Sequence, residues 1–112
     1  MQTTQPTQPT HPKIDVSKQL RIAVRSGKIA LGVKETLDAA RFSKAKLLIL
    51  ASNCPARDRE DIVHYAKQSG VPIFNYPGTS MDLGAACLKR FVVAALAIKE
   101  AGDSEILKLA ER

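Results

Sequence analysis

Apolar runs alternate with helical periodicity along this chain, and the run near its middle is the most uniform. Residues 45–51 are apolar apart from Lys46, and they end abruptly in the turn residues Ser52-Asn53-Cys54-Pro55. A short apolar run bounded by turn residues predicts a strand that helices bury on both faces. Residues 91–98 form a second apolar run after Lys89-Arg90, so we expect another strand with both faces covered.

Helix signals surround these two runs. Start and stop residues predict five helices, which are bounded by Asp15 and Gly27, by Gly32 and Phe42-Ser43, by Pro55 and Gly70, by Thr79 and Cys87, and by Gly102-Asp103-Ser104 and the C-terminus. Residues 28–31 are either a brief edge strand or a linker. Residues 71–74 are a short strand in which Pro72 indicates an edge position or a strand start, and residues 75–78 form a turn. Helices that alternate with buried strands predict an α/β fold, a three-layer α/β/α sandwich with a central sheet of about four strands.

The length and the composition predict one domain with an anionic partner. We expect residues 1–13, a polar stretch of Thr-Gln-Pro and Thr-His-Pro repeats, to be a disordered tail, and residues 14–112 to form a single domain. Lys plus Arg number 17 against 11 for Asp plus Glu, and the excess lies in the first half of the chain. A net charge of +6 favours an anionic partner, and ordinary solubility charge is the alternative.

Several function classes find no support in the sequence. Gly27 and Gly32 have the spacing of a phosphate loop, but Val33 stands where that motif needs lysine. Cys54 precedes a helix, yet His64 lies turns away on the same helix and cannot act as its base. We therefore expect no catalytic residue, no metal, no cofactor and no small-molecule substrate. With no apolar stretch of membrane-spanning length and no signal peptide, we expect a cytoplasmic protein that does not contact a membrane.

The carboxyl end of the central strand is the expected binding site, because ligands of open α/β sheets bind beyond the strand ends. Gly32 lets a phosphate approach the start of a helix, and Lys34 adds a charge there. Asn53 carries a donor and an acceptor that can read a base edge. The alternatives are an Asx-turn for Asn53, a solvated helix charge for Lys34 and a core position for Phe91.

Four stretches in order resemble a known family: Ser26 to Thr36, Leu47 to Pro55, Met81 to Gly84, and Ala101 to Leu107. Over about residues 15–109 the chain is similar to large-subunit ribosomal protein thirty of the archaeal and eukaryotic type. That family consists of kink-turn RNA binders with an α/β/α fold and no catalytic activity. The resemblance therefore implies a non-enzymatic partner of ribosomal RNA and of neighbouring ribosomal proteins, located on the ribosome.

The resemblance also implies which residues contact RNA. The full candidate set is Lys28, Gly32, Lys34, Asn53, Arg59, Arg90, Phe91 and Val92. Arg59 stands where the family often has a basic residue, a plausible phosphate contact. Val92 departs from members with arginine there, so Phe91 and Val92 are expected to form an apolar wedge against a splayed-out base, and Arg90 is the candidate to compensate.

The implied mechanism is recognition of a bent RNA in which tandem G·A pairs open the narrow major groove. Basic residues supply affinity and Asn53 supplies selectivity. Two alternatives remain open: a kink-turn binder of small nucleolar or spliceosomal particles, and a protein-binding adaptor of the same fold that uses the more acidic second half of the chain.

Overall fold

A computed structural model describes residues 15–110, with the side chains of Leu109 and Ala110 excepted. The stretch expected to be a disordered tail, residues 1–13, lies outside the described residues. The described chain folds around one sheet of four strands. These are β1 (Lys28–Leu31), β2 (Leu47–Leu50), β3 (Ile73–Asn75) and β4 (Ala95–Glu100), in the spatial order β1-β4-β2-β3.

The sheet is mixed. β2 pairs with β3 in parallel and with β4 in antiparallel orientation, and β1 pairs with β4 in antiparallel orientation. Residues 28–31 are therefore an edge strand and not a linker. β3 forms the other edge, as Pro72 predicts.

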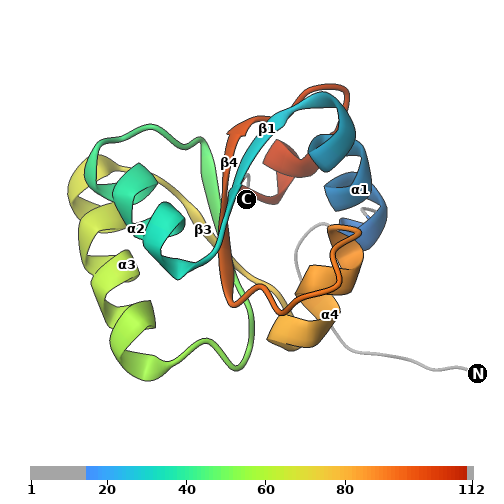
Figure 1. The fold of residues 1–112 in the computed structure, drawn as a ribbon. Coiled ribbons are helices and arrows are strands. Elements are labelled where there is room, and N and C mark those ends of the chain that lie inside the picture. The colour runs from blue at the N-terminus through green and yellow to red at the C-terminus, as the bar shows by residue number, and fades with distance from the viewer. Residues whose placement is uncertain (1–14, 111–112) are drawn as a thin grey trace, which may run out of the picture.

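Helices cover both faces of this sheet, which confirms the predicted α/β/α sandwich (Figure 1). The helices are α1 (Val16–Ser26), α2 (Val33–Arg41), α3 (Ala56–Ser69), α4 (Ser80–Ala86) and the 3-10 helix η1 (Ile106–Ala110). In Figure 1, α2 and α3 lie on one side of the sheet, and α1 and α4 lie on the other. The last predicted helix is a short 3-10 helix, η1. Near its start, Ser104 Oγ accepts a hydrogen bond from Ile106 N at 3.4 Å.

The central strand is buried on both faces, as its uniform pattern predicts. Successive side chains of a strand point to opposite faces. Leu47 and Ile49 accordingly pack into the core under α1 and α4, whereas Leu48 and Leu50 pack into the core under α2 and α3. All four side chains have no exposed surface. The strand is therefore held from both sides, and its carboxyl end is a rigid base for whatever follows it.

Local capping signals predict the helix ends well. Asp15 accepts a hydrogen bond from Lys18 N at 3.1 Å and starts α1. Thr79 and Asp82 form a reciprocal capping box at the start of α4, and Cys87 is its C-cap. Such contacts lie within four residues of each other, so the sequence alone carries the information.

The boundaries of two predicted strands are wrong. The second apolar strand was expected to begin at Phe91, but β4 begins at Ala95. Val93 N donates to Ser80 O at 3.0 Å, so this segment bonds to α4 before it joins the sheet. The strand expected at residues 71–74 is β3 at Ile73–Asn75, so Asn75, which was expected in a turn, is its last residue and pairs with Leu50.

Candidate nucleic-acid interface

Segments far apart in the sequence meet at one edge of the sheet. β1, β2 and β3 run in the same direction and β4 runs against them, so the ends of the first three strands lie beside the start of β4. Gly32 N donates to Ala95 O at 2.8 Å, and Ala51 N donates to Ala94 O at 2.9 Å. This edge lies at the bottom of the sheet in Figure 1. We call it the candidate edge; it comprises Gly32, Lys34, Asn53, Arg90, Phe91 and Val92.

Gly32 leaves the start of α2 open. Its φ of 104° and ψ of 159° are rarely adopted by residues with a side chain, and no neighbouring atom lies within 4 Å of the position that a Cβ would take. As the N-cap of α2 it offers no side-chain hydrogen bond to the first amides of the helix. Lys34 is exposed in this first turn. Uncapped amides beside a lysine favour an anionic group such as a phosphate.

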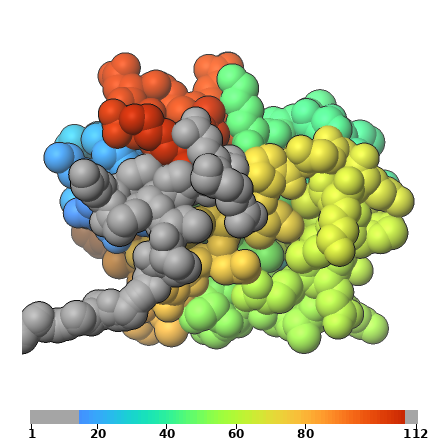
Figure 2. Space-filling model, turned by 180° about the vertical axis from the view of Figure 1, so that it is seen from behind, coloured from blue at the N-terminus to red at the C-terminus, as the bar shows by residue number. Residues whose placement is uncertain are grey.

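Asn53 is exposed, but its amide already has a partner within the protein. Asn53 Oδ1 accepts a hydrogen bond from Ser80 N at 2.7 Å, and Asn53 Nδ2 donates to Ser80 Oγ at 3.2 Å. The Asx-turn alternative is therefore wrong, since the side chain bonds to α4 and not to its own loop. An amide has two donors and two acceptor lone pairs, so one donor and one acceptor of Asn53 are left. Figure 2 shows the loop after β2 (green) beside the start of α4 (orange).

Arg59 points inward at the candidate edge. One of its terminal nitrogens donates to Asn75 Oδ1 at 2.8 Å, and the other donates to Ala51 O at 2.7 Å. The guanidinium thus joins the end of β2 to the end of β3. These two contacts leave Arg59 three of its five N–H donors. A phosphate contact from Arg59 stays a prediction, whereas its internal contacts show that it positions the loop that carries Asn53.

Phe91 and Val92 lie in the segment that leads into β4 and are mainly exposed, by 58% and 60%. The alternative that Phe91 belongs to the core is therefore wrong. Val93, the next residue, is buried and holds the segment against α4. Arg90 is exposed on the same segment. Two apolar side chains next to a cation suit contact with an unstacked base and its phosphate.

Lys28 does not lie with the other candidates. It is the first residue of β1, so it is at the opposite end of that strand from Gly32. Its ammonium lies 3.9 Å from a carboxylate oxygen of Glu100, and both side chains are well exposed. An RNA contact from Lys28 stays a prediction that this placement does not test.

Two residues of the edge network escaped sequence reasoning, namely Asn75 and Ser80. Both act through partners distant in the sequence: Asn75 through Arg59, and Ser80 through Asn53. The only local signal for Ser80 is its place directly after the capping residue Thr79. No local signal distinguishes Asn75 from a turn residue, because its role depends on strand pairing.

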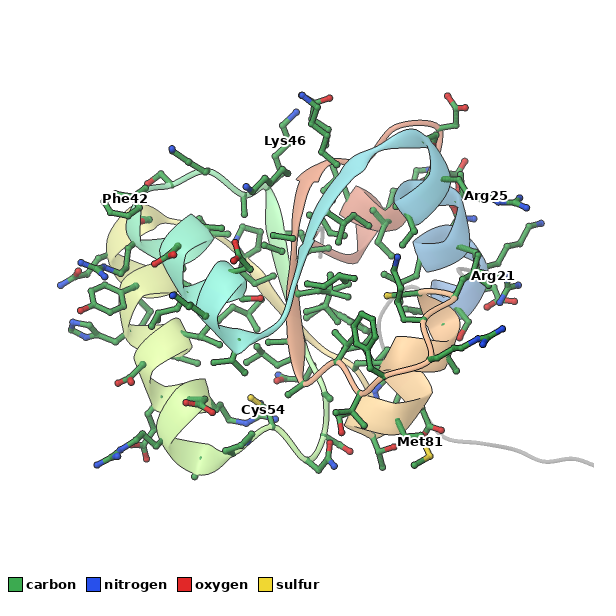
Figure 3. All side chains as sticks on the ribbon, in the orientation of Figure 1. Arg21, Arg25, Phe42, Lys46, Cys54 and Met81 are labelled. Atoms are coloured by element: carbon green, nitrogen blue, oxygen red, sulfur yellow. The ribbon has the colours of Figure 1, made fainter. Side chains whose placement is uncertain are left out.

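Neither cysteine has the properties of a nucleophile. Burial raises the pKa of the Cys54 thiol above its ordinary value, which outweighs the lowering effect of Arg59, and Asp58 raises the pKa further. Burial raises the pKa of Cys87 to about 11. Both thiols therefore stay protonated at neutral pH, and a thiol is a poor nucleophile compared with a thiolate. Figure 3 labels Cys54 between the sheet and the start of α3.

Other kinds of site find little support in the described part of the chain. Residues 15–110 contain no group of three or more side chains suited to hold a metal ion. No helix among the same residues is long and apolar enough to cross a membrane. An open pocket of about 590 Å³ lies between α1 and α4, and Ser17, Arg21, Tyr76 and Asp82 contribute to its walls. None of the candidate-edge residues lines this pocket.

The fold and the site together define a class of protein, a small three-layer α/β/α domain. One edge of its sheet presents the uncapped start of α2, the Asn53 side chain and the exposed pair Phe91 and Val92. Comparison with known proteins identifies the family. Residues 14–108 match the family described as "Ribosomal protein L7Ae/L30e/S12e/Gadd45 family", and the chain belongs to this family.

Individual relatives agree with this assignment. The protein named large ribosomal subunit protein eL30 from Pyrobaculum calidifontis is 46% identical over 98 residues, which is 88% of this chain and 97% of the relative. The eL30 proteins of Methanopyrus kandleri and Methanosarcina mazei are 45% and 47% identical, covering 83% and 85% of this chain and 85% and 88% of their own. A solved structure of a Bacillus halodurans protein of unknown function has a TM-score of 0.75 at 21% identity, covering 88% of this chain and 98% of its own. That likeness concerns the fold alone.

Proposed function

We propose that this protein is a structural component of the large ribosomal subunit and binds ribosomal RNA through the candidate edge. The observation that carries the proposal is the similarity to proteins named large ribosomal subunit protein eL30, which extends over most of both chains. Such a role places the protein on the ribosome in the cytoplasm, next to ribosomal RNA and neighbouring ribosomal proteins. The RNA-binding domain would comprise residues 14–112, with residues 1–13 outside it.

The RNA feature that we propose is a kink-turn. In such a bend, tandem G·A pairs widen a major groove that is otherwise too narrow for side chains. Asn53 would use its remaining donor and acceptor on a base edge in that groove. Lys34 and the open start of α2 would hold the adjoining phosphates.

Phe91 and Val92 provide the second half of the proposed contact. A sharp bend in RNA leaves a base without a stacking neighbour, and such bases bind to apolar and aromatic side chains. Phe91 and Val92 are exposed and fixed by the buried Val93 next to them. Arg90 would pair with the phosphate of the unstacked nucleotide.

This mechanism contains no bond-making step. Affinity comes from phosphates meeting fixed cations and amides, and selectivity comes from the base edges that Asn53 contacts. The raised pKa values of both thiols argue against either cysteine as a nucleophile.

A titration with matched RNAs tests the proposal. We expect the protein to bind a kink-turn RNA at least about fivefold more tightly than the same RNA with its G·A pairs inverted, since a lost base contact costs about 1 to 3 kcal/mol. The two RNAs have equal length and charge, so non-specific binding affects both alike. Equal affinities would show that the protein does not recognise the kink-turn.

A further inference from the structure

A second surface with the chemistry of RNA recognition lies at the far end of α2. We call it the Phe42 surface; it consists of Arg41, Phe42, Lys44 and Tyr65, and the exposed Lys46 lies further along the segment that leads into β2. Its central side chain, Phe42, is 60% exposed. Figure 3 labels Phe42 at one end of the α2 and α3 layer and Cys54, which follows Asn53, at the other. The nine residues of α2 thus separate the Phe42 surface from Gly32 at the candidate edge.

Cations and aromatic rings are interleaved on the Phe42 surface. The Arg41 guanidinium carbon lies 5.4 Å from the ring centre of Phe42 and 5.5 Å from that of Tyr65. Lys44 Nζ lies 6.0 Å from the Phe42 ring centre. These distances fall within the range of cation–π attraction, so Arg41 interacts with two rings, one at the C-cap of α2 and one on α3.

The turn that carries these side chains is well defined. Ser43 adopts a φ of 54°, and Lys44 N donates to Ala39 O at 2.9 Å, while Ser43 N donates to Ala40 O at 3.4 Å. This is the hydrogen-bond pattern of a Schellman motif, in which the residue after the C-cap is left-handed. The exposed Phe42 therefore sits on a bonded helix end and not on a loose loop.

Within residues 15–110, Arg41, Lys44 and Lys46 take part in no ion pair, although Asp38 stands three residues before Arg41. Single exposed apolar residues and solvated lysines are each ordinary. An exposed ring with two cations within 6.0 Å of its centre is less ordinary, and it matches the combination that single-stranded nucleic acids need.

We propose that the Phe42 surface binds a single-stranded segment of RNA, such as a loop or a bulge. A base would stack on the exposed Phe42 ring, and Arg41, Lys44 and the more distant Lys46 would meet the phosphates. An acidic peptide would use the cations but would gain nothing specific from a flat ring. With two surfaces at opposite ends of α2, one protein molecule could hold two separate RNA segments.

The test measures binding of a labelled single-stranded RNA of about twelve nucleotides without a kink-turn, a length within the usual site sizes. We expect Phe42→Leu to weaken binding about tenfold, because leucine keeps the bulk and removes the stacking plane. Phe42→Tyr should bind like the wild type. Lys44→Ala should lower the slope of log affinity against log salt by about 0.7, the value for one phosphate of a single strand.

Controls separate this surface from the candidate edge. Arg25→Ala removes an exposed charge from α1 on the other side of the sheet and should leave binding of the single strand unchanged. Phe42→Leu should leave kink-turn binding unchanged, whereas Lys34→Ala should weaken kink-turn binding only. Circular dichroism verifies that each variant is folded.

Three results would overturn the inference. The first is no measurable binding of the single strand by the wild type. The second is equal binding by Phe42→Leu and the wild type. The third is full competition by an acidic peptide of equal charge whose own binding is unaffected by Phe42→Leu, which would make the surface a site for acidic protein segments. None of these results bears on kink-turn binding at the candidate edge.

Discussion

The Asn53 side chain bonds to Ser80 within the protein and is also the proposed contact to an RNA base. Its hydrogen bonds to Ser80 fix the amide plane before any partner arrives, so no rotamer freedom of Asn53 is lost on binding. Arg59 adds a second constraint, because it ties Ala51 and Asn75 together beneath the same loop. The amide is thus held in place before binding, with one donor and one acceptor not used by Ser80.

The proposed phosphate contact of Lys34 can be tested through the salt dependence of binding. We expect Lys34→Ala to weaken kink-turn binding and to lower the slope of log affinity against log salt by about one, since one phosphate contact is lost. Folding stability should not change, because lysine and alanine are both good helix formers. Titrations at four or more salt concentrations measure the slope, and an unaltered slope would place Lys34 among the solvated charges.

At the scale of single residues, the sequence predicts which residues lie at the edge but not their hydrogen-bond partners within the protein. Gly32, Lys34, Asn53 and Phe91 were chosen from the sequence and do lie along one edge. The partners of Asn53 and Arg59 are 27 and 16 residues away, and local patterns carry no information about them. Lys28 belongs to the same sequence stretch as Gly32 but lies at the other end of β1, and its contact with RNA stays a prediction.

Backbone strain occurs at the ends of helices in this protein. Ser43 and Leu88 follow the C-caps of α2 and α4 with φ of 54° and 63°, in the left-handed region that favours glycine. The third such end, after α3, does have glycine: Gly70, with φ of 72°. Two of these three helices are therefore followed by a residue whose Cβ disfavours the left-handed conformation that it adopts.

Ser43→Gly should stabilise the protein by about 0.5 to 1 kcal/mol, because it removes the steric cost of a left-handed residue with a Cβ. The matched control is Gly70→Ala, which should destabilise by about 1 kcal/mol although no neighbouring atom lies within 4 Å of the new Cβ. Urea unfolding measures both changes. Destabilisation by Ser43→Gly would mean that the serine side chain contributes more than the backbone strain costs.

The apolar run that ends in β4 shows that the hydrophobic pattern predicts a strand but not the residue at which it begins. Residues 91–98 are uniformly apolar, but three different surroundings produce this uniformity. Phe91 and Val92 face outward, Val93 is buried against α4, and residues 95–98 are buried within the sheet. Hydropathy records that a residue is apolar and not what it contacts, so the strand start could not be predicted.

For the whole molecule, the layer arrangement follows from the sequence and the strand order does not. Alternating helices and buried strands predict three layers. The antiparallel insertion of β4 between β1 and β2 depends on long-range pairing. This insertion matters for function, because it brings the start of β4, with Phe91 and Val92 before it, to the edge where the other strands end.

Deletion of residues 1–13 should leave the melting temperature within a few degrees of the full chain. The segment has no apolar residue after Met1, so it has little surface that could stabilise the fold. Differential scanning calorimetry on both chains measures the difference. A larger fall would mean that the segment packs against the domain and that the predicted domain boundary is wrong.

The most direct test of the central claim is equilibrium titration of Asn53→Asp against a kink-turn RNA. The carboxylate keeps the acceptor for Ser80 N, and Ser80 Oγ can donate to it, so circular dichroism should report an intact fold. The matched control is Asn75→Asp, which adds the same charge to the neighbouring strand end and keeps the acceptor for Arg59. We predict that Asn53→Asp loses about 1 to 3 kcal/mol of binding free energy beyond the loss in Asn75→Asp. Wild-type affinity in Asn53→Asp, or equal losses in the two variants, would contradict recognition of RNA by Asn53.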